Sequence, residues 1–217
     1  MIRAVCFDLD GTLADTLPVV YSAFQHVTQQ FLGRTYIEEE IARLFGPSEE
    51  GIIRRLLPRN QWDDGIRAFH VFYKKAHASC RTPYEGIDTA LVLLKKKGVL
   101  LAVVTGKGAV SANLSLQKLG LMRYFDLIEY GSVSGCSKGP ALRRILGNWK
   151  LKPNELAYVG DSASDMRDAK NVGVIALGAG WGNGVNLHQL KQEATTAFPT
   201  VSSLISWING HLKDATV

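Results

Sequence analysis

The chain has 217 residues, of which 46% are hydrophobic and 21% are charged, and its formal net charge is +5. A chain of this size can bury a sizeable core, either as one domain or as a core that carries a smaller insert. The lysines and arginines are scattered and form no basic groove with interleaved aromatic residues, so the charge does not predict a nucleic-acid partner. A mildly basic surface suits an anionic small substrate equally well.

Three cysteines lie far apart, without the spacing of a zinc site, in a chain too long to need disulfide bonds. This usage predicts reduced thiols and a cytoplasmic protein. The first residues do not read as a signal peptide, and no apolar run is long enough to span a bilayer. The sequence therefore predicts no membrane partner, and it leaves open whether the protein is a monomer or a homodimer.

The first predicted element is a short buried strand. Residues 4–7 form a compact apolar run that ends in Asp8-Leu9-Asp10-Gly11, which is typical of a strand followed by a tight turn. The next stretch, residues 17–83, carries apolar residues at helical spacing. Pro18 and Pro83 stand near its two edges and disfavour a helix that continues across them. We therefore predict an all-helical insert after the first strand.

From Gly86 onward, short apolar runs alternate with amphipathic helices, the pattern of a parallel sheet covered on both faces. Helices are predicted at 87–97, 109–119, 140–149, 164–171 and 201–212, and strands at 99–104, 125–128, 156–159, 172–177 and, weakly, 197–198. The predicted fold is an α/β doubly wound parallel sheet. Its Rossmann-like core would comprise residues 1–16 and 84–217, and a small helical cap domain would comprise residues 17–83.

Polar residues stop four of the predicted strands. In chain order they are Asp8 with Asp10, then Thr105-Gly106-Lys107, then a segment containing Lys138, and finally Asp161 with Asp165. Right-handed crossovers bring the carboxyl ends of parallel strands to one edge of the sheet, where ligands bind. We therefore expect several carboxylates, a hydroxyl and an ammonium to converge there. Lys107 could contact the substrate, but an exposed lysine at the start of a helix is the commoner case and is what we expect here.

Such a cluster of carboxylates needs a counter-ion, and hard oxygen ligands suit Mg²⁺, whereas zinc or copper would favour histidine or cysteine. Beside the cation, Asp8 could attack a phosphorus atom in line and form an aspartyl-phosphate. Asp10 is placed to protonate the leaving oxygen and then to deprotonate water. Asp165 fits either the metal shell or the start of a helix, where a carboxylate complements the helix dipole.

These segments resemble the four ordered motifs of the haloacid-dehalogenase-like hydrolases, and the match runs over nearly the whole chain. The motifs are Asp8-Leu9-Asp10-Gly11-Thr12-Leu13 with Asp15, then Thr105, Lys138, and Gly160-Asp161-Ser162-Ala163-Ser164-Asp165. Pro83-Tyr84-Glu85-Gly86 and Trp181-Gly182 resemble landmarks of the phosphoglycolate-phosphatase-like branch. There are two departures. Gly106 stands where an asparagine is usual, and Gly139 separates Lys138 from Pro140.

The resemblance implies a magnesium-dependent phosphatase that hydrolyses a small phosphorylated metabolite, such as a phosphoglycolate-like phosphomonoester. It implies Asp8 as nucleophile, Asp10 as acid and base, Thr105 and Lys138 as phosphate ligands, and Asp8, Asp10 and Asp161 as metal ligands. To these we add the backbone amide of Gly106 as a phosphate ligand and Asp165 as a candidate metal ligand. The carbonyl oxygen of Asp10 would be its metal ligand. The helical insert would be a mobile cap that closes over the site.

Three alternatives stay open at this point. A sugar-phosphate mutase or a pyrophosphatase would share the chemistry at the strand ends, and an inactive interaction module is disfavoured because every charged position is present. The mutases of the family carry an arginine at the position of Glu49, where it can grip a second phosphate. A carboxylate there is expected to repel that phosphate and to favour hydrolysis. We also expect the loop at residues 45–48 to reach the site and the glycine-rich loop 178–184 to form its rim.

Overall fold

The computed structural model describes residues 1–135 and 138–212, and these form one six-stranded sheet in the order β3-β2-β1-β4-β5-β6. Every neighbouring pair of strands is parallel. The strands are β1 (Ala4–Phe7), β2 (Leu100–Val104), β3 (Leu127–Glu129), β4 (Leu156–Gly160), β5 (Ile175–Ala179) and β6 (Thr196–Phe198). The chain builds outward from β1 in both directions, which confirms the predicted doubly wound sheet.

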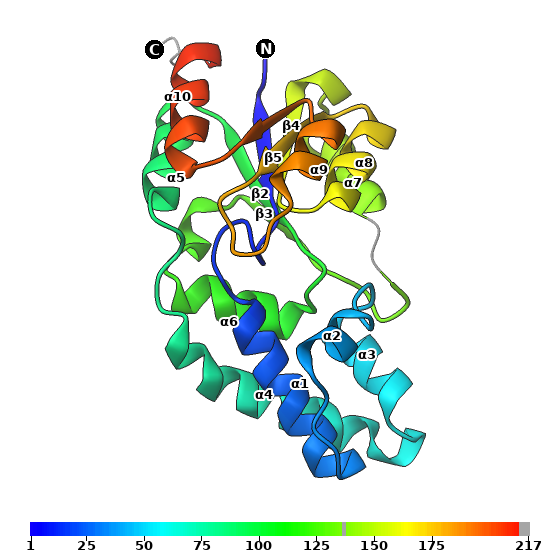
Figure 1. Ribbon diagram of the computed structural model, residues 1–217. Helices are drawn as coiled ribbons and strands as arrows, with labels where there is room; N and C mark the ends of the chain where they lie inside the picture. The colour runs from blue at the N-terminus through cyan, green and yellow to red at the C-terminus, as the bar shows by residue number, and fades with distance from the viewer. Residues whose placement is uncertain (136–137, 213–217) are drawn as a thin grey trace.

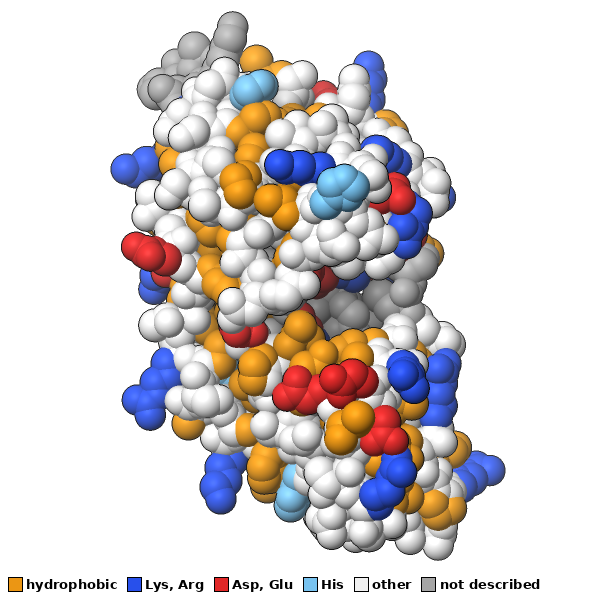
Figure 2. All heavy atoms as spheres, in the orientation of Figure 1, with side chains coloured by type: hydrophobic (Ala, Val, Ile, Leu, Met, Phe, Trp, Pro, Cys, Tyr) orange, Lys and Arg blue, Asp and Glu red, His pale blue; other side chains and the backbone are white. Residues whose placement is uncertain are grey.

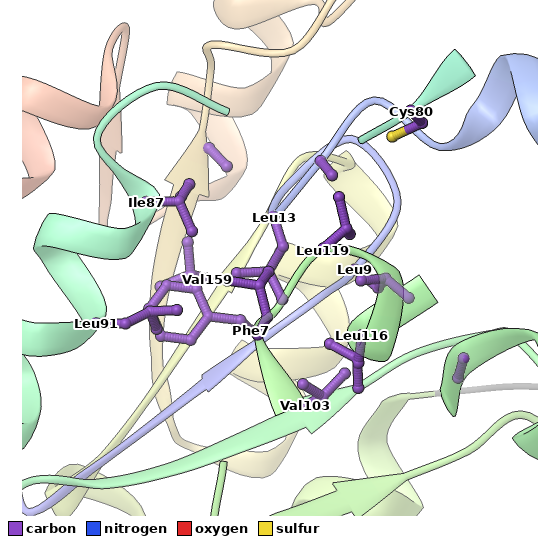
Figure 3. Packing of buried hydrophobic residues seen from close by; sticks show 14 of the residues in the cluster. Phe7, Leu9, Leu13, Cys80, Ile87, Leu91, Val103, Leu116, Leu119 and Val159 are labelled. Atoms are coloured by element: carbon purple, nitrogen blue, oxygen red, sulfur yellow. The ribbon is translucent and has the colours of Figure 1, made fainter. Parts of the chain in front are cut away.

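Helices cover both faces of the sheet because successive side chains of the buried strands point to opposite faces. Val5 and Phe7 belong to one hydrophobic cluster, while Ala4 and Cys6 belong to the other. The first cluster includes residues of α5 (Ile87–Lys96), α6 (Ala109–Lys118) and α10 (Val201–His211). The second includes residues of α7 (Lys138–Trp149), α8 (Ala163–Val172) and α9 (Leu187–Glu193). Figure 3 shows Phe7 and Val159 directed toward Leu91 of α5.

The register of the central strands fixes where the polar residues begin. Phe7 lies beside Val103 of β2 and beside Val159 of β4. The amide of Asp8 then donates a hydrogen bond of 2.9 Å to the carbonyl of Val159. Asp8 therefore lies directly after the apolar part of β1, between the carboxyl ends of β2 and β4.

The helical insert of residues 17–83 lies beyond the carboxyl ends of the strands, in the lower half of Figure 1. Its helices are α1 (Leu17–Leu32), α2 (Glu38–Ala42), α3 (Glu49–Leu56) and α4 (Trp62–Ala76). The rings of Phe24 in α1 and Phe69 in α4 are 4.7 Å apart at the core of this insert. Short 3₁₀ helices complete the chain: η1 (Arg59–Gln61), η2 (His77–Ser79), η3 (Met122–Tyr124) and η4 (Pro153–Glu155).

Several element boundaries differ from those predicted. Helix α7 begins at Lys138, two residues before the predicted start, because Pro140 is tolerated in a first turn, where helical amides lack partners. Strand β5 begins only at Ile175, since Gly173 ends α8 in the left-handed conformation with a φ of 84°. Helix α9 was not predicted in the mixed C-terminal segment. In the described ranges, no helix has the length and apolar character that crossing a membrane requires.

Candidate functional site

The candidate site is a cavity of about 370 Å³ between the carboxyl ends of the strands and the helical insert. Figure 2 shows the molecule hollowed between its two halves, with acidic side chains visible inside. The side of the cavity that belongs to the core is lined by Asp8, Asp10, Gly106, Lys107, Lys138, Asp161, Ser162, Ser164 and Asp165. The insert contributes Leu17, Val20, Tyr21, Phe24, Phe45, Gly46, Pro47, Glu49 and Ile52. One wall is thus charged and the other is mostly apolar.

Three carboxylates from two neighbouring strand ends meet in this cavity. One oxygen each from Asp8, Asp161 and Asp165 lies within 4.8 Å of the others. The amide of Leu9 donates a hydrogen bond of 2.7 Å to Oδ1 of Asp8 and fixes the orientation of its carboxylate. The loop after β1 can approach Asp161 only because Gly11 lacks a side chain. A Cβ atom at Gly11, which has a φ of +71°, would lie 2.3 Å from Oδ2 of Asp161.

The ammonium group of Lys138 stands among these carboxylates. Nζ of Lys138, the first residue of α7, lies 2.5 Å from Oδ2 of Asp8 and 3.1 Å from Oδ1 of Asp165. It also donates a hydrogen bond of 2.8 Å to the hydroxyl of Tyr158. One positive charge beside three carboxylates leaves a net negative charge in a buried place, where unpaired charge is costly.

The pKa values of Asp8 and Asp161 are raised because their charged forms are unfavourable in this place. Burial raises the pKa of Asp8 to about 7, with the Lys138 ammonium opposing the rise and the Asp165 carboxylate adding to it. Burial and the charges of Asp8 and Asp165 raise the pKa of Asp161 to about 8. A divalent cation would relieve this repulsion. An all-oxygen donor set with room for water and phosphate oxygens fits Mg²⁺.

Asp165 lies in the first turn of α8 and also belongs to the carboxylate cluster. Its amide donates a hydrogen bond of 3.1 Å to Oγ of Ser162, and its Oδ2 accepts one of 3.3 Å from the amide of Ser162. These two bonds form a capping box at the start of α8. Its Oδ1 faces Lys138 in the carboxylate cluster. The capping box therefore holds Asp165 in position for the cluster.

The residues predicted to hold phosphate lie at different depths. Gly106 and Lys138 line the cavity, whereas Thr105 does not and is only 1% exposed. Oγ1 of Thr105 accepts a hydrogen bond of 3.2 Å from the amide of Lys107 and so shapes the loop after β2. Gly131 allows a neighbouring loop to pass closely over this turn, since a Cβ there would lie 1.9 Å from the carbonyl oxygen of Gly106.

The prediction that Lys107 is an exposed lysine was wrong. Its side chain is 3% exposed, and its Nζ lies 3.1 Å from Oδ1 of Asp10 and 3.6 Å from Oε1 of Glu49. Lys107 precedes Gly108, the N-cap of α6, and the helical insert covers it. Oε2 of Glu49 also accepts a hydrogen bond of 2.6 Å from the amide of Gly108. Burial raises the pKa of Glu49, and the Lys107 ammonium opposes this rise.

The two loops singled out in the sequence have different positions. Phe45, Gly46 and Pro47 line the cavity, as expected for the loop that reaches from the insert. The glycine-rich loop lies outside the cavity lining and braces the loop after β1 instead. Nε1 of Trp181 donates a hydrogen bond of 2.9 Å to the carbonyl of Thr12, which belongs to that loop.

Known proteins resemble this chain over most of its length. A family model described as haloacid dehalogenase-like hydrolase matches residues 5–179. A phosphoglycolate phosphatase from Chromobacterium violaceum is 32% identical over 83% of this chain and 86% of that protein. The pyrophosphatase PpaX from Bacillus pumilus is 29% identical over 83% of this chain and 84% of that protein. A solved structure described as a predicted phosphoglycolate phosphatase from Haemophilus somnus superposes with a TM-score of 0.80 at 22% identity, covering 95% of this chain and 97% of that one.

We expect the metal-free protein to lose stability as the pH rises. The pKa values of Asp8 and Asp161 lie at about 7 and about 8 in the fold, above their ordinary value of 3.8. The stabilisation by their protonated forms is complete below that ordinary value and is lost as the pH rises through 7 and 8. In excess chelator, the Tm of the parent should fall between pH 6 and pH 9. The Tm of Asp161→Asn should fall over the same range by about 2 °C less, or by a still smaller amount.

Added Mg²⁺ should raise the Tm of the parent more at pH 9 than at pH 6, because the carboxylates are then fully charged. Asp161→Asn should lose most of this increase. A metal-free parent whose Tm changes with pH just as that of the variant does would contradict the account.

The close approach of Gly11 to Asp161 gives a second prediction. Gly11→Ala should weaken Mg²⁺ binding, measured as the Mg²⁺-induced rise in Tm, because the new Cβ must displace the carboxylate of Asp161. Gly33→Ala is the matched control, since Gly33 also has a positive φ, of +67°, but a Cβ there meets no atom within 4 Å. Both variants should lose about 1 kcal/mol for the left-handed backbone. Equal Mg²⁺ responses in the two would show that the contact with Asp161 does not matter.

Proposed function

The chain belongs to the haloacid dehalogenase-like hydrolase family, and from this premise we propose that it is a magnesium-dependent phosphatase acting on a small phosphorylated metabolite. The observation that carries the proposal is the group of Asp8, Asp161 and Asp165 within 4.8 Å, with the Lys138 ammonium beside Asp8, in a cavity of about 370 Å³. A cavity of this size admits a small phosphomonoester.

Asp8 is the proposed nucleophile. Its Oδ1 is held by the Leu9 amide and its Oδ2 by Lys138, so its carboxylate has a fixed direction at the floor of the cavity. Attack on phosphorus would form an aspartyl-phosphate and release the alcohol. Asp10, two residues later, also lines the cavity and is the proposed acid that protonates the leaving oxygen. In the second half of the reaction it would accept a proton from the attacking water.

We assign the cation to Asp8, Asp161, Asp165 and the backbone carbonyl of Asp10. When bound, Mg²⁺ would neutralise negative charge on these carboxylates and on the phosphate. Phosphate oxygens would be held by the Lys138 ammonium, by the backbone amide of Gly106 and by Thr105. Thr105 is buried, so we expect its hydroxyl to contact the phosphate less directly than the Lys138 ammonium and the Gly106 amide do. Its main role would be to shape the loop after β2.

We further propose that the helical insert, residues 17–83, is a cap domain over a core of residues 1–16 and 84–217. Its cavity wall is largely aliphatic and aromatic, and it would exclude water from the reacting phosphate. The same wall would contact the leaving group and select it. A phosphoglycolate-like phosphomonoester is our proposed substrate class, in line with the name of the relative from Chromobacterium violaceum.

A cytoplasmic location fits the thiols. Cys6 and Cys80 are both free and buried, as expected for a protein of a reducing compartment. The third cysteine, Cys136, lies outside the described residues.

The same cavity argues against a mutase, for a reason that differs from simple repulsion. A second phosphate would need cationic or amide groups at the end of the cavity near the insert. Two such groups there, the Lys107 ammonium and the Gly108 amide, are already engaged by the carboxylate of Glu49. Bringing a further anion to this end would require Glu49 to leave both partners. Hydrolysis of a monophosphorylated substrate is therefore favoured over transfer to a second position.

Asp8→Asn should abolish phosphate release while the fold is retained, because a neutral amide cannot form the acyl-phosphate. The measurement is release of inorganic phosphate in Mg²⁺ from a panel of phosphorylated acids, sugars, nucleotides and pyrophosphate, with circular dichroism as the control for folding. Turnover of the variant within about tenfold of the parent would rule out Asp8 as the nucleophile.

The hydrolase and mutase hypotheses are separated by a phosphorus NMR time course. A hexose 1-phosphate is supplied alone and then together with its 1,6-bisphosphate. We expect inorganic phosphate to be released in both experiments, with no dependence on the bisphosphate. Interconversion of the 1- and 6-phosphates faster than phosphate release would establish a mutase instead.

A further inference from the structure

Lys107 is a buried cation that the proposed chemistry does not use. Its ammonium lies 3.1 Å from Oδ1 of Asp10, 3.6 Å from Oε1 of Glu49 and 4.8 Å from the centre of the Tyr73 ring. The hydroxyl of Thr16 donates a hydrogen bond to the same Oδ1 of Asp10. Asp10 is therefore held at one carboxylate oxygen from two sides, which leaves Oδ2 as the oxygen that can carry a proton.

The partners of Lys107 come from both parts of the molecule. Asp10 and Lys107 belong to loops at the strand ends of the core, while Glu49 lies in the first turn of α3 and Tyr73 lies in α4 of the insert. Burial by itself lowers the pKa of Lys107, but the neighbouring Asp10, Tyr73 and Glu49 outweigh it and raise that pKa overall. The ammonium thus stays charged in a place that is closed by residues of the insert.

A second set of contacts shows that α3 is seated on the core at this point. The amide of Ser48 donates a hydrogen bond of 2.8 Å to the carbonyl of Ser132. Gly51 packs so closely that a Cβ there would lie 2.4 Å from the carbonyl oxygen of Val133. The same core loop is tied to the Lys107 loop, because the amide of Gly131 donates a hydrogen bond of 2.8 Å to the carbonyl of Lys107. The core loop that contacts α3 is therefore also the loop that contacts the Lys107 backbone.

We propose that Lys107 is a positioning residue that fixes Asp10 for proton transfer, and that Glu49 and Tyr73 fix Lys107 in turn when the insert is docked. The inference rests on the proposed function, because it assigns Asp10 the role of acid. Its consequence is that the acid is assembled by the seating of α3, whereas the cluster of Asp8, Asp161 and Lys138 is complete within the core.

The test uses a series of aryl phosphates whose phenol leaving groups differ in basicity, from 4-nitrophenyl phosphate to phenyl phosphate and 4-methoxyphenyl phosphate. Loss of an acid slows the poor leaving groups most, by a factor of about 10² to 10⁴ when the acid is lost entirely. Lys107→Met should therefore steepen the dependence of kcat/KM, which reports the step that releases the phenol, on leaving-group basicity, as Asp10→Asn does. Lys107→Arg should restore most of the parent dependence, and Glu49→Gln should show a smaller change of the same sign.

The double variant makes the test decisive. If Lys107 acts through Asp10, adding Lys107→Met to Asp10→Asn should change kcat/KM by less than about threefold for every substrate. A large additional loss that is equal for all leaving groups would overturn the inference. Lys95→Met is the control, because Lys95 pairs with Asp126 at the surface, away from the cavity lining. Thermal melts identify variants that fail to fold, and Lys107→Arg remains informative if the methionine variant does.

The aryl phosphate series tests the acid role of Asp10 separately from the positioning role of Lys107. If Asp10→Asn itself shows no dependence on the leaving group, the acid role in the proposed function is wrong. If Asp10→Asn shows the dependence and Lys107→Met does not, only the positioning role of Lys107 is wrong.

Discussion

The repulsion among three carboxylates at the centre of one sheet edge is the constraint to which much of this structure responds. Oxygens of Asp8, Asp161 and Asp165 approach within 4.8 Å, and the burial of Asp8 and Asp165 removes water that would screen their charges. Lys138 offsets part of the charge, and it is placed by α7, which begins at that residue. A hard divalent cation could neutralise the remaining negative charge, and a phosphate anion could then approach. The cluster is thus poorly stable alone and suited to a ligand that brings its own charge.

The sheet and the insert divide the chemistry between them. The parallel register of β1 and β4 places the nucleophile candidate and its carboxylate neighbours side by side, so this half of the site depends on the core alone. The acid candidate, Asp10, is different, since its ammonium partner Lys107 is enclosed by residues of the insert. If the insert were undocked, the cluster of Asp8, Asp161 and Lys138 would stay assembled, whereas Lys107 would lose the partners that hold it beside Asp10.

Much of the fold followed from local patterns. The apolar runs that end in Asp8, Thr105 and Asp161 identified three strands and the edge where ligands bind, because the burial of a parallel sheet makes strand ends conspicuous. Lys107 was misjudged because its burial depends on Glu49, which is distant in the sequence and reaches it only through the docking of the insert. Gly108, which follows Lys107, was an available signal, since a Cβ there would lie 2.3 Å from Oε2 of Glu50 in the insert. The identity of the leaving group could not be read, because the wall that contacts it is assembled from several helices.

The proposed mechanism requires the carboxylate of Asp8 to become phosphorylated during turnover. The most direct measurement is to quench the protein in acid during turnover of a phosphorylated substrate with Mg²⁺, reduce it with borodeuteride and locate the product by peptide mass spectrometry. Borodeuteride reduces an acyl-phosphate of aspartate to deuterated homoserine. We expect this label at position 8 and at no other carboxylate, and only when substrate is present. Release of phosphate without any label at position 8, or with the label at another carboxylate, would contradict it.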